Sequence, residues 1–137
     1  MPSADSLHSL PLRIAFTYDC KSEWLALGYS AEQCAEFDSE KTIERIATSL
    51  RKLGTVEIIG RLKSLTKVLA TSESKPNWDI VFNICEGLGD TGRESQVPGL
   101  LEGWGIPFTF SDSATLALCL DKAKTKVSGS MPFTIQM

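Results

Sequence analysis

The sequence has little histidine, no closely paired cysteines and no long apolar run. The single histidine, His8, lies in a polar leader, so a His-based catalytic triad is not predicted. The four cysteines (Cys20, Cys34, Cys85 and Cys119) form no C-x-x-C pair, which argues against a zinc site and favours free thiols in a reducing compartment. No stretch approaches the roughly 20 apolar residues of a membrane span, and the start lacks the apolar run of a signal peptide. We therefore expect a cytoplasmic protein with no membrane partner and no metal site.

Clusters of basic residues are also missing. The 137 residues carry 14 Lys and Arg against 17 Asp and Glu, a formal charge of −3. Without a basic patch, a nucleic-acid partner is not expected. The length suits one domain, and a composition of 42% hydrophobic and 23% charged residues is ordinary for a globular protein.

Two kinds of apolar segment alternate along the chain. Short apolar runs typical of strands lie at 12–17, 56–59, 79–84 and 106–110. Each precedes a segment with helical spacing or helix caps, at about 39–53, 62–69, 95–104 and 114–126. This alternation predicts an α/β fold: a small, Rossmann-like, doubly wound parallel sheet of about four strands in the order 2-1-3-4, flanked by helices. The expected domain covers 12–126 and follows a leader at 1–11.

The stretch ICEGLGDTGRESQ, at 84–96, contains the dinucleotide-binding fingerprint G-x-G-x-x-G. Its glycines are Gly87, Gly89 and Gly92, a predicted strand precedes them and a predicted helix follows. Asp112 lies about 20 residues further on, where a ribose-binding acid would stand.

Three features weigh against a dinucleotide at this loop. The motif follows the third strand instead of the first, and the acids Glu86, Asp90 and Glu94 surround the place of a pyrophosphate. Pro98 moves the expected helix start to about Ser95 or Gln96, because proline is tolerated only in the first turn. Two alternatives remain open: a turn that needs glycine for positive φ, or a loop for another kind of ligand.

A second irregular segment, at 18–37, is too long for an ordinary connection between strand and helix, and such loops are often functional. In the order 2-1-3-4 it would face the glycine loop at 86–94 across the crevice where strand order reverses. Mixed charges and aromatics there suit a zwitterionic or amine-bearing small molecule, and Glu86 would serve as acid or base if burial raises its pKa. Trp78 and Trp104 are expected to pack in or beside the core. The candidate substrate-binding residues of these two loops are Tyr18, Asp19, Lys21, Glu23, Trp24, Tyr29, Glu86, Gly87 and Arg93.

Four stretches taken together carry a family resemblance: RIAFTYDCKSEWLALGYS, FDSEKTIERIATSL, DIVFNICEGLGDTGRESQVPGLLEGWGIPFTFSD and TLALCLDKAKTK. They resemble the N-terminal, pre-ATP-grasp domain of D-alanine–D-alanine ligase-like proteins in the ATP-grasp superfamily. The resemblance runs from Leu12 to Lys126. It implies a small doubly wound sheet, and members commonly form dimers through this domain.

The resemblance also implies a chemistry. Complete ligases use ATP and Mg²⁺ to join two amino-acid-like substrates through an acyl phosphate. Lys122 would reach the ATP phosphates, and the loop after the third strand would face the first substrate. A glutamate of the first helix, within 36–40, would touch the substrate amine, and Glu40 is therefore a further candidate substrate-binding residue. Better-known members have histidine where Glu86 stands, so the resemblance does not assign D-alanine as the substrate.

The resemblance stops at Lys126, and residues 127–137 (VSGSMPFTIQM) are a non-family tail. Val127-Ser128 is what an in-frame splice-donor signal would encode, so our hypothesis is a translated intron start or an equivalent truncation. Without the ATP-grasp domains proper, we expect neither ligase activity nor a bound cofactor from this chain alone. Three interpretations stay open: a truncated ligase domain, a stand-alone small-molecule enzyme or binding protein with a biosynthetic tailoring role, and a dimeric interaction module.

Overall fold

The computed structural model describes residues 11–89 and 92–110, which form an α/β fold around a parallel sheet. The described sheet has three strands in the order β2-β1-β3. Ile14 of the central strand lies opposite Val56 on one side and Ile80 on the other. The strands are β1 (Leu12–Thr17), β2 (Gly54–Gly60) and β3 (Ile80–Asn83).

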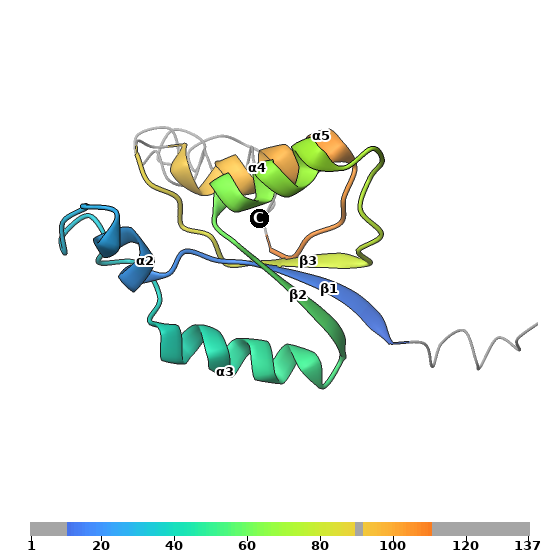
Figure 1. Ribbon diagram of the computed structural model, residues 1–137, viewed down its shortest axis with the longest axis horizontal. Coiled ribbons are helices and arrows are strands. Elements are labelled where there is room, and N and C mark those ends of the chain that lie inside the picture. The colour runs from blue at the N-terminus through green and yellow to red at the C-terminus, as the bar shows by residue number, and fades with distance from the viewer. Residues whose placement is uncertain (1–10, 90–91, 111–137) are drawn as a thin grey trace, which may run out of the picture.

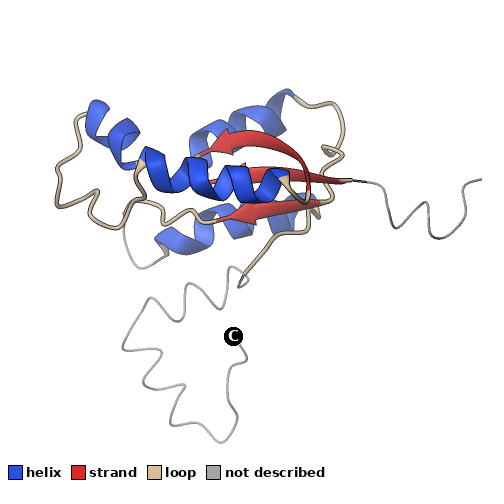
Figure 2. Ribbon diagram, turned by 90° about the horizontal axis from the view of Figure 1, so that it is seen from below, coloured by secondary structure: helices blue, strands red, loops and turns tan. Residues whose placement is uncertain are grey.

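Helices cover both faces of this sheet. Figure 1 shows α3 (Glu40–Arg51) below it, with α4 (Leu62–Thr71) and α5 (Gln96–Trp104) above it. Seen from below in Figure 2, α3 lies across the strands in front. The predicted class, a parallel sheet flanked by helices, is confirmed.

The central strand β1 supplies both hydrophobic layers because its side chains alternate between the two faces. Ile14 and Phe16 pack with Ala47 and Leu50 of α3. Ala15 belongs to the opposite cluster, which contains the three fully buried leucines of the upper helices, Leu65, Leu69 and Leu101. Each such leucine contributes about 1.5–3 kcal/mol by burial. Trp78 is buried in that cluster and Trp104 packs against it, as expected from the sequence.

The prediction of a fourth strand at 106–110 is wrong. Residues 106–110 make one isolated parallel bridge, Val81 to Phe108, at the outer edge of β3. Val81 N–H donates to Pro107 O at 2.9 Å, and Thr109 N–H donates to Val81 O at 3.0 Å. Pro107 itself lacks an N–H, and Phe110 has the left-handed φ of 72°, which ends the extended backbone. The segment therefore sits where a fourth strand was expected but does not form one.

The segment at 18–37, predicted to be irregular, also differs from the prediction because part of it is helical. It contains the short helix α2 (Lys21–Ala26), which carries no buried residue. The base of this segment is closed by an isolated parallel bridge between Cys20 and Asp38. Lys21 N–H donates to Asp38 O at 2.9 Å, and Asp38 N–H donates to Asp19 O at 3.3 Å.

Two predicted helix starts are confirmed. Ser39 Oγ accepts a hydrogen bond from Thr42 N–H at 3.2 Å and so caps α3. The helix α5 begins at Gln96 and has Pro98 in its first turn. Among the described helices, none has the length and apolar character needed to cross a bilayer. His8, Asp90, Asp112, Cys119, Lys122, the expected helix at 114–126 and the tail lie outside the described residues.

Candidate ligand-binding crevice

The carboxyl ends of β1 and β3 hold the buried polar residues of the described chain, Thr17, Asp19 and Asn83. Thr17 Oγ1 donates to Asn83 Oδ1 at 2.9 Å. The same Oδ1 accepts from Cys85 N–H at 3.1 Å. These bonds join the two strand ends at the point where the strand order reverses, which is where doubly wound sheets bind ligands.

Asp19 ties the long segment after β1 to the glycine loop after β3. Its side chain is only 2% exposed. Asp19 Oδ2 accepts hydrogen bonds from Glu86 N–H at 2.9 Å and from Gly87 N–H at 2.8 Å. Asp19 Oδ1 accepts from Trp24 Nε1–H at 2.9 Å. The two segments predicted to meet across one crevice therefore do meet.

An aromatic cluster orders the segment after β1. The Trp24 ring lies edge-on to Tyr29, with centroids 5.0 Å apart, and 5.4 Å from the Phe37 ring. Ser30 and Gln33 bond each other reciprocally, since Ser30 N–H donates to Gln33 Oε1 and Gln33 N–H donates to Ser30 Oγ. This packing holds residues 32–37 opposite the glycine loop.

The glycine loop is a tight turn folded against the 3₁₀ turn η1 (Arg93–Ser95). Gly87 and Gly89 have positive φ values of 71° and 129°, which favour glycine. A Cβ on Gly87 would lie 2.3 Å from Arg93 O. Gly92 has an ordinary φ of −95°. The first two glycines of the fingerprint thus serve the turn itself.

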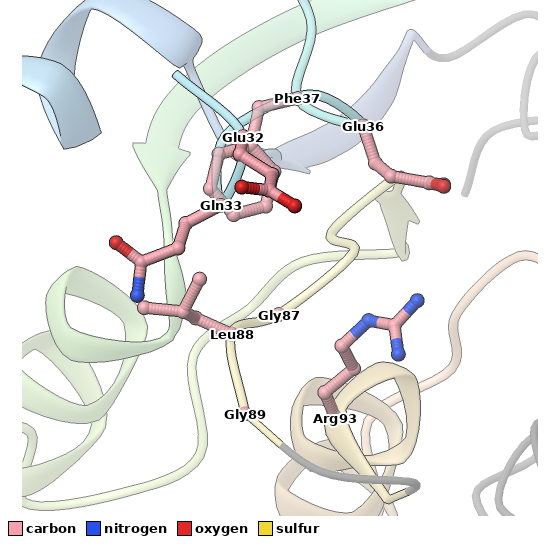
Figure 3. A pocket seen from close by; sticks show the side chains of 8 residues that line it. All are labelled: Glu32, Gln33, Glu36, Phe37, Gly87, Leu88, Gly89 and Arg93. Carbon is pink, nitrogen blue, oxygen red and sulfur yellow. The ribbon is translucent and has the colours of Figure 1, made fainter. Parts of the chain in front are cut away.

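Two hollows adjoin this turn and together form what we call the crevice. The first, of about 480 Å³, lies between residues 32–37 and the turn. Figure 3 shows Glu32 and Gln33 on the side facing Leu88, while Arg93 rises from the other side of the turn. The second, of about 420 Å³, is lined by Asp38, Asn83, Glu86, Glu94 and Phe110, among others. The crevice is therefore mainly acidic, with Arg93 as its basic residue.

Among the carboxyl groups that line the crevice, that of Glu86 has the most strongly shifted pKa. Burial raises its pKa from 4.5 to about 7, helped by a hydrogen bond with the Glu94 carboxyl and by the charges of Glu94, Glu36 and Asp38. A carboxyl with a pKa near neutrality exchanges a proton readily with a bound ligand. Cys85, the preceding residue, is buried, and burial raises the pKa of its thiol well above 9.0. The thiol is therefore protonated and a poor nucleophile.

Replacing Glu86 with glutamine should change the pH dependence of stability. The folded state holds the Glu86 proton more tightly than the unfolded state, so stability falls as the pH rises from 4.5 through about 7. The variant should not show this fall. Its free energy of unfolding, compared with that of the wild type, should therefore be higher at about pH 8 than at about pH 5. Urea midpoints at both pH values measure the effect. Glu73→Gln, at an exposed position, is the control. If the stability difference between Glu86→Gln and the wild type were the same at both pH values, the raised pKa of Glu86 would be contradicted.

The structure does not bring the other predicted binding residues together at one place. Tyr29 and Asp19 line a third hollow on the far side of the turn, while Gly87 and Arg93 line the crevice. Tyr18 packs in the lower core beside Phe16, and burial raises the pKa of its hydroxyl. Lys21, Glu23 and Glu40 line none of these three hollows. Glu40 instead accepts a hydrogen bond from Ser22 Oγ at 2.7 Å.

Sequence reasoning missed residues that follow strands or close loops. Asp38 reaches the crevice because the bridge with Cys20 returns the chain to the end of β1. Arg61 and Lys63, beside the third hollow, come directly after β2. Their position at the carboxyl end of a predicted parallel strand was the signal that would have found them.

The resemblance implies ATP and Mg²⁺ for complete ligases. Within residues 11–89 and 92–110, no three His, Cys, Asp or Glu side chains are placed to hold a metal ion. Lys122, expected at the ATP phosphates, lies outside this part. We therefore derive no phosphoryl-transfer step from the described residues.

Comparison with curated proteins finds D-alanine–D-alanine ligases. The chain is 33% identical over 82 residues to the enzyme of Xanthomonas axonopodis pv. citri, which is 59% of this chain and 24% of that one. The Erythrobacter litoralis enzyme is 36% identical over 84 residues, 61% of this chain and 24% of its own. That of Xylella fastidiosa is 38% identical over 58 residues, 42% of this chain and 19% of its own.

These matches confirm the resemblance to D-alanine–D-alanine ligases that the sequence motifs indicated. The chain spans about a quarter or less of the length of the ligases it matches. No family model matches the sequence. No solved structure matches it either.

Proposed function

We propose that this chain is the substrate-side portion of a D-alanine–D-alanine ligase-like protein, and that its crevice binds the amine of a small amino-acid-like molecule. The observation that carries the proposal is the gathering of four carboxyl groups beside the end of β3. Glu86 lies at the centre, and the charges of Glu36, Asp38 and Glu94 all raise its pKa. The matched relatives, whose name gives D-alanine as substrate, support the same class of ligand.

An ammonium group would relieve this excess of negative charge. The pKa of about 7 at Glu86 reflects desolvation and like charges, and a bound cation lowers that cost by direct Coulombic attraction. Glu86 would release its proton and pair with the amine, and in that role it is also the candidate acid or base. Arg93, in the adjoining hollow, presents a planar guanidinium that suits a carboxylate. The crevice thus offers partners for both ends of an amino acid.

The resemblance leaves open which glutamate within 36–40 touches the amine. Glu36 lines the crevice, and its charge acts on Glu86. Glu40 lies on α3, where its carboxylate accepts the bond from Ser22. We therefore assign the amine contact to Glu36 instead of Glu40.

D-alanine should raise the thermal unfolding midpoint by a few degrees at neutral pH, because a ligand that binds only the folded state stabilises it. Propionate, which lacks the amine, should give almost no shift. Ethylamine, which lacks the carboxylate, should give a smaller shift than D-alanine. Thermal unfolding with all three compounds over a range of concentrations measures this.

The matched variants are Glu86→Gln in the crevice and Glu73→Gln on an exposed connection. Glu86→Gln should abolish most of the D-alanine shift, and Glu73→Gln should keep it. Equal shifts with propionate and D-alanine would overturn the proposal, as would an unchanged D-alanine response in Glu86→Gln.

A homodimer is a second candidate. Three apolar residues on or beside the edge strand β2 and its neighbour β1 are exposed: Leu12 at 43%, Leu53 at 62% and Ile58 at 45%. Apolar surface of this kind commonly marks contacts between subunits. Measurement of the mass in solution tests this candidate without reference to any ligand.

A further inference from the structure

The largest of the hollows lies on the opposite side of the glycine loop from the acidic carboxyl groups. It measures about 870 Å³ and sits between the α2 region, α4 and the start of α5; we call it the basic hollow. This volume is in the range of pockets that bind small molecules. Leu27, Leu62, Ala70 and Val97 give it an apolar part.

Its charged lining is of the opposite sign to that of the crevice. Arg61, Lys63 and Lys67 contribute three basic side chains. The acid in this lining is Asp19, which is buried and whose two oxygens already accept bonds from Trp24, Glu86 and Gly87. Neither lysine joins an ion pair within the described residues. A positive hollow in a chain of net charge −3 would attract an anion.

Aromatic side chains form one wall. Trp24 and Tyr29 both line the basic hollow, and their rings meet edge to face. The Arg61 guanidinium carbon lies 5.2 Å from the Trp24 ring centroid, so a cation–π contact holds this cation beside the aromatic wall. A positive charge and a flat aromatic surface therefore lie side by side in this hollow.

We propose that the basic hollow binds a small anion attached to an aromatic ring. The phosphate or carboxylate group contacts Arg61, Lys63 and Lys67, and the ring packs against Trp24 and Tyr29. The site is distinct from the amine site, because it shares with the crevice Cys85, Gly87 and Leu88 but none of the charged side chains. It does not depend on the function proposed above.

Phenyl phosphate is the probe, with inorganic phosphate and phenol as its two halves. In amide NMR titrations, phenyl phosphate should shift the amides of Leu62 and Lys63 and the indole N–H of Trp24. It should bind more tightly than inorganic phosphate, because the ring adds apolar contact. Phenol should leave these signals unchanged, and added salt should weaken the binding of phenyl phosphate.

The test variant reverses two exposed charges, Lys63→Glu with Lys67→Glu. It should weaken phenyl phosphate binding roughly tenfold or more. The control makes the same change in net charge at α3, below the sheet, through Lys41→Glu within the helix and Lys52→Glu at its C-cap, and should bind nearly as the wild type does. Equal weakening in both variants would overturn the proposal, and so would unchanged binding in the test variant.

The amine site and the basic hollow can fail separately. Glu86→Gln should leave phenyl phosphate binding intact, and the lysine reversal should leave the D-alanine shift intact. Loss of both responses in one variant would mean a single shared site and would contradict the separation argued here.

Discussion

Replacing Asp19 with alanine should lower the free energy of unfolding by about 3 kcal/mol or more. The carboxylate accepts bonds from Glu86 N–H, Gly87 N–H and Trp24 Nε1–H, and its side chain is 2% exposed. Alanine would leave three partly buried donors without an acceptor, and each donor that water does not reach costs about 1–3 kcal/mol. Urea unfolding, followed by tryptophan fluorescence, measures the loss.

The same variant should separate the two segments at the crevice. Without the shared carboxylate, the residues after β1 and the glycine loop are no longer tied, so D-alanine should no longer raise the thermal unfolding midpoint of the variant. Asp79→Ala is the matched control, because Asp79 is exposed and accepts one backbone bond from Arg13 N–H at 2.7 Å. It should cost about 1 kcal/mol. A comparable loss for both variants would show that Asp19 is not the tie between the segments.

Replacing Gly87 with alanine should cost about 2–4 kcal/mol, since the left-handed backbone alone costs about 1–2 kcal/mol for a residue with a Cβ. The rest comes from contact with main-chain atoms. The new Cβ would meet Arg93 O at 2.3 Å and Arg93 C at 2.8 Å, and a backbone cannot rotate away as a flexible side chain can. Urea midpoints measure the cost, and the D-alanine shift should weaken because the turn between the hollows has moved.

Gly103→Ala provides the control for this substitution. Gly103 lies within α5, and a Cβ there would meet nothing within 4 Å. Alanine is the better helix former, so this variant should be as stable as the wild type or gain up to about 1 kcal/mol. If Gly87→Ala proved as stable as Gly103→Ala, the tight contact between the turn and η1 would be refuted.

Several elements follow directly from local chemistry. The predicted strand at 12–17 matches β1, because a strand buried on both faces reads as a continuous apolar run. Ser39 and Pro98 placed two helix starts, because a side-chain cap and a proline act within a single turn. The fourth strand failed because Pro107 removes a donor and Phe110 turns the backbone, which an apolar run alone does not reveal.

The site was less predictable than the fold. The sequence placed Glu86, Gly87 and Arg93 at one crevice through topology, but it also grouped Tyr18 with them, although that side chain faces the lower core. It could not distinguish Glu36 from Glu40, because the choice depends on how the chain returns between Cys20 and Asp38. It also did not reveal that the basic residues after β2 gather opposite Trp24.

The sequence by itself determined the α/β class, the parallel alternation, the likeness to D-alanine–D-alanine ligases and the meeting of two loops at the strand ends. The likeness rests on matching sequence stretches. The other three follow from periodicity and local residue chemistry, which act over a few neighbouring residues. Only the tertiary structure decided that Asp19 ties the loops, that Glu86 has a pKa of about 7, and that acidic and basic hollows lie on opposite sides of one glycine turn. The reason is physical: burial, shared hydrogen bonds and electrostatic fields arise between residues far apart in the chain, and they exist only once the sheet has brought those residues together.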